Sequence, residues 1–397
     1  MKIYLVGGAV RDKLLGLPVQ ERDWVVTGAT PQEMLDLGYK QIGKDFPVFL
    51  HPETKEEYAL ARTERKTAPG YKGFAFHAAP DVTLEEDLKR RDLTINAMAE
   101  SPEGELIDLF GGQEDLKLGK LRHVSPAFVE DPVRILRVAR FAARFDKLGF
   151  SVTHETNTLM REMVTAGEVN HLVPERVWAE LYKALVTDRP EIFFCVLHDC
   201  DALAVLFPEI EATYDGHIGV HANPDKLPDA LTALRHSAEN TEEPRVRFAV
   251  LLLSLHSDQT RTQRITNAET LCKRFRIPGD YRVLALDAIR HEENITGRDH
   301  RALLDMMESV RAFHDATRWQ QLLDTYVITG HITRHQAEQL EAARQKATAV
   351  KANDLDDPLL KGPAIGVALK EKRCQVIEST FMDYKNSANN TTPRNNR

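Results

Sequence analysis

The order of apolar and polar residues predicts two regions of different fold class. In the first 120 residues, polar segments alternate with short apolar runs that are typical of strands. These runs lie at residues 2–8, 23–28 and 56–63. Two polar segments carry capping-box patterns that predict helix starts at Thr30 and Thr83. From about residue 125 to about 378, the apolar residues follow a helical period. We therefore expect an α+β protein with an N-terminal mixed-sheet head and all-helical domains after it.

Changes in this pattern also predict the domain boundaries. We expect a head at 1–120, a helical neck at 121–210 and a helical body and tail at 211–383. Residues 384–397 are polar and lack an apolar period, which predicts a disordered tail. Residues 66–81 combine glycine, proline and aromatic residues without a period, which predicts a long loop.

Composition excludes several classes of protein. The sequence has no run of about 18 apolar residues and no signal peptide at its start, so we expect a cytoplasmic protein with no membrane partner. The 4 cysteines lack paired spacing, and we expect neither a disulfide nor zinc. The net charge of −8, taken alone, argues against a nucleic-acid partner. Binding to phosphates depends on local basic patches, however, and these must be sought directly.

Candidate chemistry is concentrated at residues 5–26. Gly7 and Gly8 would let the backbone approach a triphosphate at a strand-to-helix turn, where Arg11 favours anionic oxygens. Glu21 and Asp23 are two residues apart, so on a strand both carboxylates would point to one face and could reach the same pair of divalent metal ions. A glycine pair is usually only a tight turn, and an acidic pair is usually solvated surface. Their order along the chain is the stronger signal.

A second candidate segment is the helix expected at 130–144. Asp131, Arg134 and Arg137 recur every three residues, and Arg140 and Arg144 continue nearby, which predicts a basic stripe. Apolar residues fill the opposite face. The spacing alone favours an amphipathic helix whose arginines are solvated, and we keep that interpretation for Arg144.

Together these segments resemble the class II CCA-adding tRNA nucleotidyltransferases of the polymerase-beta superfamily. The resemblance covers about residues 1–210 and rests on motifs in the family's order. They are GGAVRD at 7–12 followed by acidic-x-Asp, RRDLTINAM at 90–98, EDPVRILRVARFAAR at 130–144 and PERVWAEL at 174–181. The resemblance implies that CTP and ATP supply C, C and A to the 3′ end of tRNA without a nucleic-acid template. It implies Mg²⁺ as cofactor and tRNA as partner, through its 3′ end and its acceptor and elbow region, and no DNA partner.

The same resemblance assigns roles to individual residues. Metal binding and catalysis fall to Glu21 and Asp23, with Glu57 as a third catalytic carboxylate and Glu64 as its competitor. Nucleotide binding falls to Gly8, Arg11, Arg91, Asp131, Arg134, Arg137 and Arg140. Within this set, Asp131 and Arg134 would face the Watson–Crick edge of the incoming base. Cytosine and adenine both place an exocyclic amino donor beside a ring-nitrogen acceptor, so one carboxylate and one guanidinium suit both bases.

Two departures from the family pattern leave alternatives open. The first acidic position is usually aspartate, and Glu21 adds a methylene group. Leu253-Ser254 stands where longer relatives with a phosphohydrolase domain have His-Asp, so we expect that activity to be absent. One alternative function is a poly(A) polymerase or an enzyme that adds only A. Another is a tRNA-binding protein without catalytic activity.

Overall fold

The computed structural model describes most of the 397-residue chain. The described residues are 1–42, 48–66, 74–214, 227–256, 258–296, 299–355 and 359–390. Only the backbone is described for 64–66, 74–77 and 383–390. The chain forms two compact units, Met1–Leu227 and Pro228–Arg397. The first unit contains both the predicted head and the predicted neck, and each unit is described by itself.

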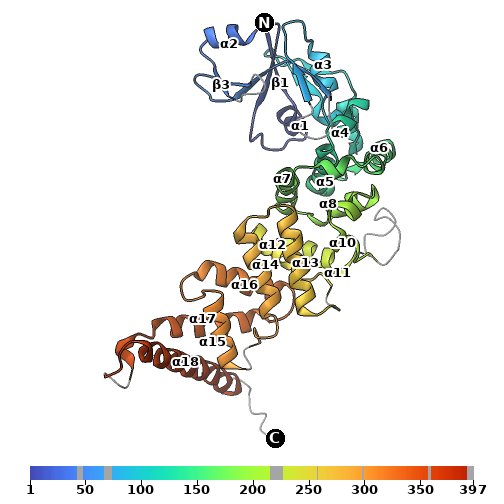
Figure 1. The fold of residues 1–397 in the computed structure, drawn as a ribbon. Coiled ribbons are helices and arrows are strands. Elements are labelled where there is room, and N and C mark those ends of the chain that lie inside the picture. The colour runs from blue at the N-terminus through green and yellow to red at the C-terminus, as the bar shows by residue number, and fades with distance from the viewer. Residues whose placement is uncertain are drawn as a thin grey trace. The chain divides into compact units, whose positions relative to one another are not determined.

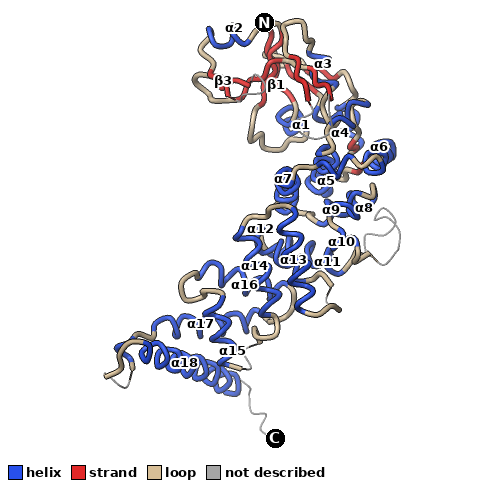
Figure 2. Tube along the Cα trace, in the orientation of Figure 1, coloured by secondary structure: helices blue, strands red, loops and turns tan. Residues whose placement is uncertain are grey.

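The head is built on a seven-stranded sheet with the order β3-β4-β5-β2-β1-β8-β9 (Figures 1 and 2). Its strands are β1 (Lys2–Val6), β2 (Asp23–Thr27), β3 (Lys40–Ile42), β4 (Val48–Leu50), β5 (Glu57–Leu60), β8 (Met98–Glu100) and β9 (Leu106–Asp108). β1 pairs with β2 in the antiparallel sense, whereas β2 pairs with β5 in the parallel sense. The prediction of a mixed sheet is thereby confirmed.

The head contains short helices, and two of them begin at the predicted signals. The helices are α1 (Gly8–Leu14), α2 (Pro31–Asp36), α3 (Leu84–Lys89), the 3₁₀ turn η1 (Thr94–Asn96) and α4 (Gly112–Leu118). Thr30 caps α2 and Thr83 caps α3, each in a complete capping box. Buried residues of the strands and helices form two apolar clusters, one around Val6 and Leu88 and the other around Met34 and Phe49.

The neck is helical, with one small exception. Its α-helices are α5 (Val133–Phe145), α6 (His154–Thr165), α7 (Pro174–Leu185), α8 (Glu191–Asp199), α9 (Ala202–Leu206) and α10 (Pro208–Glu211). Its 3₁₀ turns are η2 (Pro126–Glu130), η3 (Asp146–Leu148) and η4 (Glu168–His171). The exception is a short parallel pair of strands, β10 (Lys120–Leu121) and β11 (Ser151–Val152). Each strand has only two residues, which is too short for the sequence pattern to reveal. α5 packs against α7 and α8, with its apolar face buried as expected.

The second unit is helical throughout its described residues. It comprises α11 (Asp229–Asn240), α12 (Pro244–Leu253), α13 (Arg261–Arg274), α14 (Gly279–His291), α15 (His300–Ser309), α16 (Ala316–Ile328), α17 (Arg334–Ala349), η6 (Ala352–Asp354) and α18 (Pro363–Asn390). α12 lies against α11, α14 and α16, and most of its residues are buried. None of the described helices has the length and apolarity that a membrane span requires.

Two expectations about irregular segments differ from the structure. The loop predicted at 66–81 contains a strand, β7 (Phe74–His77), which pairs with β6 (Thr63–Lys66) through long-range hydrogen bonds that a local pattern does not reveal. The tail predicted to be disordered from 384 continues α18 as far as Asn390. This helix packs on α15 and α17, and it buries Ile377 and Thr380. Residues 67–73 and 391–397 lie outside the described residues.

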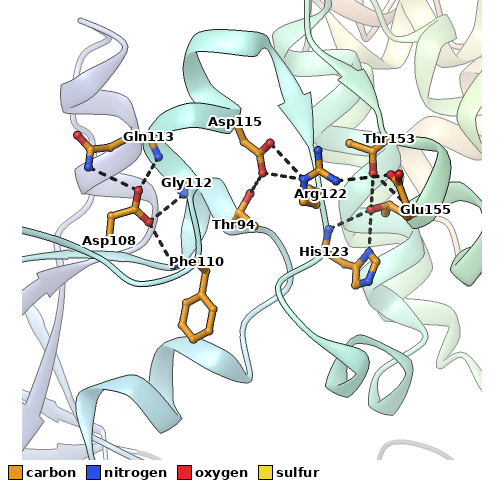
Figure 3. A network of polar contacts seen from close by, with 11 residues as sticks. Thr94, Asp108, Phe110, Gly112, Gln113, Asp115, Arg122, His123, Thr153 and Glu155 are labelled. Atoms are coloured by element: carbon orange, nitrogen blue, oxygen red, sulfur yellow. Dashed lines mark hydrogen bonds and ion pairs between the residues drawn. The ribbon is translucent and has the colours of Figure 1, made fainter.

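A polar network fixes η1 between the head and the neck (Figure 3). The Asp108 carboxylate accepts hydrogen bonds from the backbone N–H groups of Gly112 (2.8 Å) and Gln113 (2.9 Å) at the start of α4. Within α4, Asp115 accepts from Thr94 Oγ1 (2.7 Å) in η1 and from Arg122 Nε (3.2 Å). The neighbouring residues 92–96 are therefore held in place, and they carry two side chains into the cleft described next.

Candidate active site

A cleft of about 1060 Å³ lies within the first unit, lined by the head, α5 and α7. It brings together all the residues that the sequence singles out, namely Gly8, Arg11, Glu21, Asp23, Glu57, Arg91, Asp131, Arg134, Arg137 and Arg140. Ten arginine and lysine side chains and seven carboxylates line its described part. The local basic patch that the net charge of −8 conceals is therefore this cleft.

The turn between β1 and α1 has the geometry of an anion site. Gly7 has a φ of +69°, and its N–H donates to the Met98 carbonyl at 3.2 Å. A Cβ atom at Gly7 would lie 2.9 Å from Nη1 of Arg91, so glycine is needed for the guanidinium to approach the turn. Nη2 of Arg91 donates to Asp87 at 3.0 Å, whereas its buried Nε has no hydrogen-bond partner within the described chain. Such a group is available to an anionic ligand.

Arg11 lines the same cleft, but protein groups already engage its guanidinium. Nε donates to Asp12 at 2.8 Å, Nη1 donates to Asn96, and the guanidinium carbon lies 5.0 Å from the centre of the Phe141 ring. Only 3% of Arg11 is exposed, and this burial lowers its pKa although Asp12 opposes the shift. These contacts hold α1 against α5, and they distinguish Arg11 from Arg91.

Two of the carboxylates predicted to be catalytic lie at the starts of two neighbouring strands. Asp23 begins β2, and Glu57, at the start of the parallel strand β5, is its partner in the register. Glu21 precedes β2, so the prediction that it shares a strand with Asp23 is wrong. The charge of Glu21 nevertheless acts on Asp23. Desolvation in the cleft raises the pKa of Asp23, Arg91 lowers it, and the Glu21 charge raises it further. The side chain of the competitor, Glu64, lies outside the described residues.

The carboxylates of Glu21 and Asp23 could hold a divalent cation together with the phosphate oxygens of a ligand. No set of three or more His, Cys, Asp or Glu side chains forms a ready-made metal cage in the described residues. Magnesium in phosphoryl-transfer sites usually binds one or two carboxylates together with phosphate oxygens and water. Because the charge on Glu21 raises the pKa of Asp23, a cation between the two carboxylates would relieve their repulsion.

Fixed partners hold the two residues expected to read the base. Both oxygens of Asp131 accept from the Arg176 guanidinium, at 3.2 and 2.8 Å, and Oδ1 also accepts from the Val133 N–H at 3.1 Å. Arg134 donates to the main-chain oxygens of Ala127 (2.7 Å) and Arg90 (2.6 Å). Sequence reasoning missed Arg176, although the residue lies in the quoted segment PERVWAEL.

The remaining arginines of α5 each pair with a carboxylate. Each donates to a carboxylate: Arg137 Nε to Asp92 (2.6 Å), Arg140 Nε to Glu180 (2.5 Å) and Arg144 Nη2 to Asp12 (2.9 Å). Arg144 is exposed, as expected for a solvated residue, and it also lines the cleft and contacts the head through Asp12. Two of these three pairs connect the neck to the head.

Two family models match the first unit. Residues 3–122 match the poly A polymerase head domain. Residues 149–213 match a model described as the probable RNA and SrmB-binding site of polymerase A. Together they include the β1–α1 turn, the β2 and β5 carboxylates and α7.

Relatives of known name extend the comparison over nearly the whole chain. The multifunctional CCA protein of Thioalkalivibrio sulfidiphilus is 53% identical, over 97% of this chain and 100% of the relative. This chain belongs to the family of CCA-adding enzymes. A second member, the CCA-adding enzyme of Coxiella burnetii, is 48% identical over 96% of this chain and 95% of its own.

Solved structures show that the fold is also that of the CCA-adding enzymes. An apo form of one such enzyme superposes with a TM-score of 0.63 at 24% identity, covering 96% of this chain and 92% of the other. The Thermotoga maritima enzyme, solved with tRNA, gives a TM-score of 0.59 at 23% identity, covering 96% of this chain and 91% of the other. The cleft of this CCA-adding family member is thus formed by a head and neck of the family fold.

Proposed function

We propose that this protein adds C, C and A, in that order, to the 3′ end of tRNA, using CTP and ATP. The observation that carries the proposal is the content of one cleft. It combines the carboxylates of Asp23 and Glu57, the unpartnered Nε of Arg91 beside the Gly7 turn, and the pair Asp131 and Arg134. Groups that could bind phosphate, bind a cation and recognise a base therefore line the same cleft, where one bound nucleotide could contact them. Since tRNA is the substrate, we expect the protein in the cytoplasm.

In the reaction, a bond forms between the tRNA 3′-oxygen and the α-phosphorus of the nucleotide, and the bond from that phosphorus to the pyrophosphate oxygen breaks. Glu21 and Asp23 would hold Mg²⁺, beside Glu57, and this cation supplies charge stabilisation at the attacking and leaving oxygens. The proton of the 3′-hydroxyl is lost to solvent. Arg91 donates to the triphosphate, which the open Gly7-Gly8 turn admits close to the backbone.

Base selection falls to Asp131 and Arg134. Asp131 accepts from the exocyclic amino group of cytosine or adenine, and Arg134 donates to the neighbouring ring nitrogen. The Arg176 fork fixes the Asp131 carboxylate, and two main-chain oxygens fix the Arg134 guanidinium, so both groups are oriented before the base enters. Uracil and guanine would place a carbonyl oxygen against the carboxylate, which leaves desolvated groups unpaired at a cost of about 1–3 kcal/mol each.

Single-nucleotide assays on three tRNA substrates test this function. The purified protein is incubated with tRNA that ends before C74, after C74 or after C75, together with one labelled nucleoside triphosphate. We expect CTP to extend the first two substrates and ATP to extend only the third. Repeated ATP addition to every substrate would instead show a poly(A) polymerase, and tRNA binding without any incorporation would show a non-catalytic binding protein.

A further inference from the structure

One face of α7 is exposed near the C-terminal end of the helix. The opposite face of α7 is buried against the neck through Val177, Leu181 and Ala184. On the exposed face, Tyr182 is 41% exposed and Val186, the C-terminal cap of the helix, is 48% exposed. These two residues are four apart and therefore lie on one side of the helix. We name Tyr182, Lys183 and Val186 the α7 strip.

The α7 strip is continuous with the catalytic cleft. Lys183 and Val186 line the same cleft as Asp23 and Asp131. The Lys183 side chain is 56% exposed, and its amino group lies 3.9 Å from Glu180, whose other carboxylate oxygen accepts from Arg140. Tyr182 is outside the described lining of the cleft and lies one turn before Val186 on the same side of α7. An aromatic ring, a cation and an apolar side chain are therefore close together next to the cleft. Single exposed apolar residues are common on proteins, but this combination at the entrance of a nucleotide site is characteristic of single-strand binding.

We propose that the α7 strip binds the single-stranded 3′ end of the tRNA, with the Tyr182 ring stacked on an unpaired base and Lys183 beside a phosphate. This inference rests on the proposed function. The 3′ end must enter the cleft beside the bound nucleotide, and its last base changes after each addition. Stacking on an aromatic ring and contact with a phosphate accept any base, whereas hydrogen-bond recognition of one base would fail at the next step.

Other observations agree with this partner. The α7 strip lies within residues 149–213, which match the model of a probable RNA-binding region. The described lining of the cleft has more basic than acidic side chains, which favours a polyanion. RNA bound there would pass from the exposed side of α7 towards Asp23, where its 3′-hydroxyl is required.

Steady-state kinetics on three variants test the proposal. The substrates are tRNA ending in CC and ATP. For Tyr182→Ala we expect the KM for tRNA to rise about 5- to 150-fold, as the loss of one base–aromatic stack predicts, while the KM for ATP stays within about twofold of wild type. Tyr182→Phe keeps the ring and should restore the wild-type KM for tRNA. Leu118→Ala, at a 57% exposed residue of α4 outside the cleft lining, is the matched control and should change neither constant.

A charge variant and a stacking probe provide an independent readout. Lys183→Glu should weaken tRNA binding, and more so at low salt, whereas the control Lys117→Glu on the exposed side of α4 should not. An RNA hairpin with 2-aminopurine as its 3′-terminal base should lose fluorescence on binding wild type and Tyr182→Phe, but not Tyr182→Ala.

Two results would overturn the inference. One is a KM for tRNA in folded Tyr182→Ala within twofold of wild type, and the other is equal quenching of 2-aminopurine by that variant. If wild type extends tRNA while these results are obtained, the α7 strip proposal alone fails. If wild type extends no tRNA at all, the proposed function itself fails.

Discussion

At the scale of single residues, some charged groups of the cleft are paired with other protein groups, whereas others could still bind a ligand. The buried Arg11 and Asp12 satisfy each other, and the exposed Arg144 also donates to Asp12. Arg91 keeps an unpartnered Nε within the described chain, and Asp23 carries a charge that burial and Glu21 disfavour. A triphosphate and a cation would satisfy both, so we assign these two residues the largest share in catalysis.

The first prediction concerns Asp23. Asp23→Asn removes the negative charge with almost no change in shape, and we expect incorporation of CTP and of ATP to fall by more than about 100-fold alike, because both nucleotides need the same cation site. Affinity for tRNA should stay near wild type. The control Asp81→Asn changes an exposed aspartate outside the cleft lining and should retain full activity. Substantial turnover by Asp23→Asn would remove this residue from the reaction.

The second prediction concerns base selection by Asp131. Asp131→Ala removes the acceptor for the exocyclic amino group, so discrimination should relax rather than chemistry cease. We expect weaker use of CTP and ATP together with measurable incorporation of UTP or GTP. The relative kcat/KM should shift by about 1–3 kcal/mol, which is about 5- to 150-fold.

A matched control separates this effect from lost stability. The Asp131 carboxylate also accepts from the Val133 N–H near the start of α5, and loss of such a cap costs about 1 kcal/mol. Thr153→Ala removes a similar cap from α6, outside the cleft lining, and should leave selectivity intact. If Asp131→Ala folds, binds tRNA and still excludes UTP and GTP as wild type does, the base-reading role of Asp131 is wrong.

At the scale of elements, the pair between Asp92 and Arg137 joins residues 92–96 to α5. Burial alone would raise the pKa of Asp92, but Arg137, Asn96 and the Leu93 N–H outweigh it and hold this pKa well below its usual range. The charged Asp92 therefore stabilises the folded state. That stabilisation is complete above the unfolded pKa, near 4, and declines as the pH falls below it.

The third prediction follows from this sign. Asp92→Asn should lower the free energy of unfolding by about 1–3 kcal/mol at pH 7, towards the lower end because 36% of the Arg137 side chain is exposed to screening solvent. The difference from wild type should shrink at pH 3, where the unfolded state of wild type binds a proton. Urea unfolding of both proteins at pH 3 and at pH 7 measures this difference in the free energy of unfolding. An equal difference at the two pH values would contradict the account.

Local signals made some elements predictable, and long-range pairing determined the others. The caps at Thr30 and Thr83 depend on neighbouring residues only, and both form as predicted. β7 exists because it pairs with β6 across an intervening segment, and α18 packs on α15 and α17. No periodicity within either segment encodes those partners.

The candidate site shows the same division. Motif order identified many of the residues that the cleft gathers from the head and from α5, but it gave no role to others that line the cleft, such as Arg62, Asn96 and Phe141. The pairings of Arg144 with Asp12 and of Asp131 with Arg176 link residues 132 and 45 positions apart, and sequence spacing carries no information about them. The resemblance supplied roles, whereas the structure supplied the partners that orient each group.

At the scale of the whole molecule, the Leu253 segment of the second unit is part of a packed core. Leu253 is 2% exposed, and its carbonyl accepts from Arg264 Nη2 at 2.6 Å. Nη1 of Arg264 donates to both oxygens of Glu292, at 2.7 and 2.9 Å. An apolar core and an ion pair therefore surround Leu253, the position at which the resemblance expects a His-Asp pair in longer relatives.

The fourth prediction is that this unit hydrolyses no phosphate ester. The purified protein should release no product from 2′,3′-cyclic nucleotides or p-nitrophenyl phosphate in the presence of Ni²⁺ or Mg²⁺, while it remains active on tRNA. Product release that copurifies with the protein and requires metal would show that the second unit retains a hydrolytic site.

The central claim is that one protein cleft selects C, C and A for addition to the 3′ end of tRNA. Sequencing of the 3′ ends made from tRNA that lacks CCA, with all four nucleoside triphosphates and Mg²⁺ present, tests it most directly. The account predicts products that end in C, CC and finally CCA, with no further extension. Ends that carry runs of A, or U or G at any of the three positions, would contradict it.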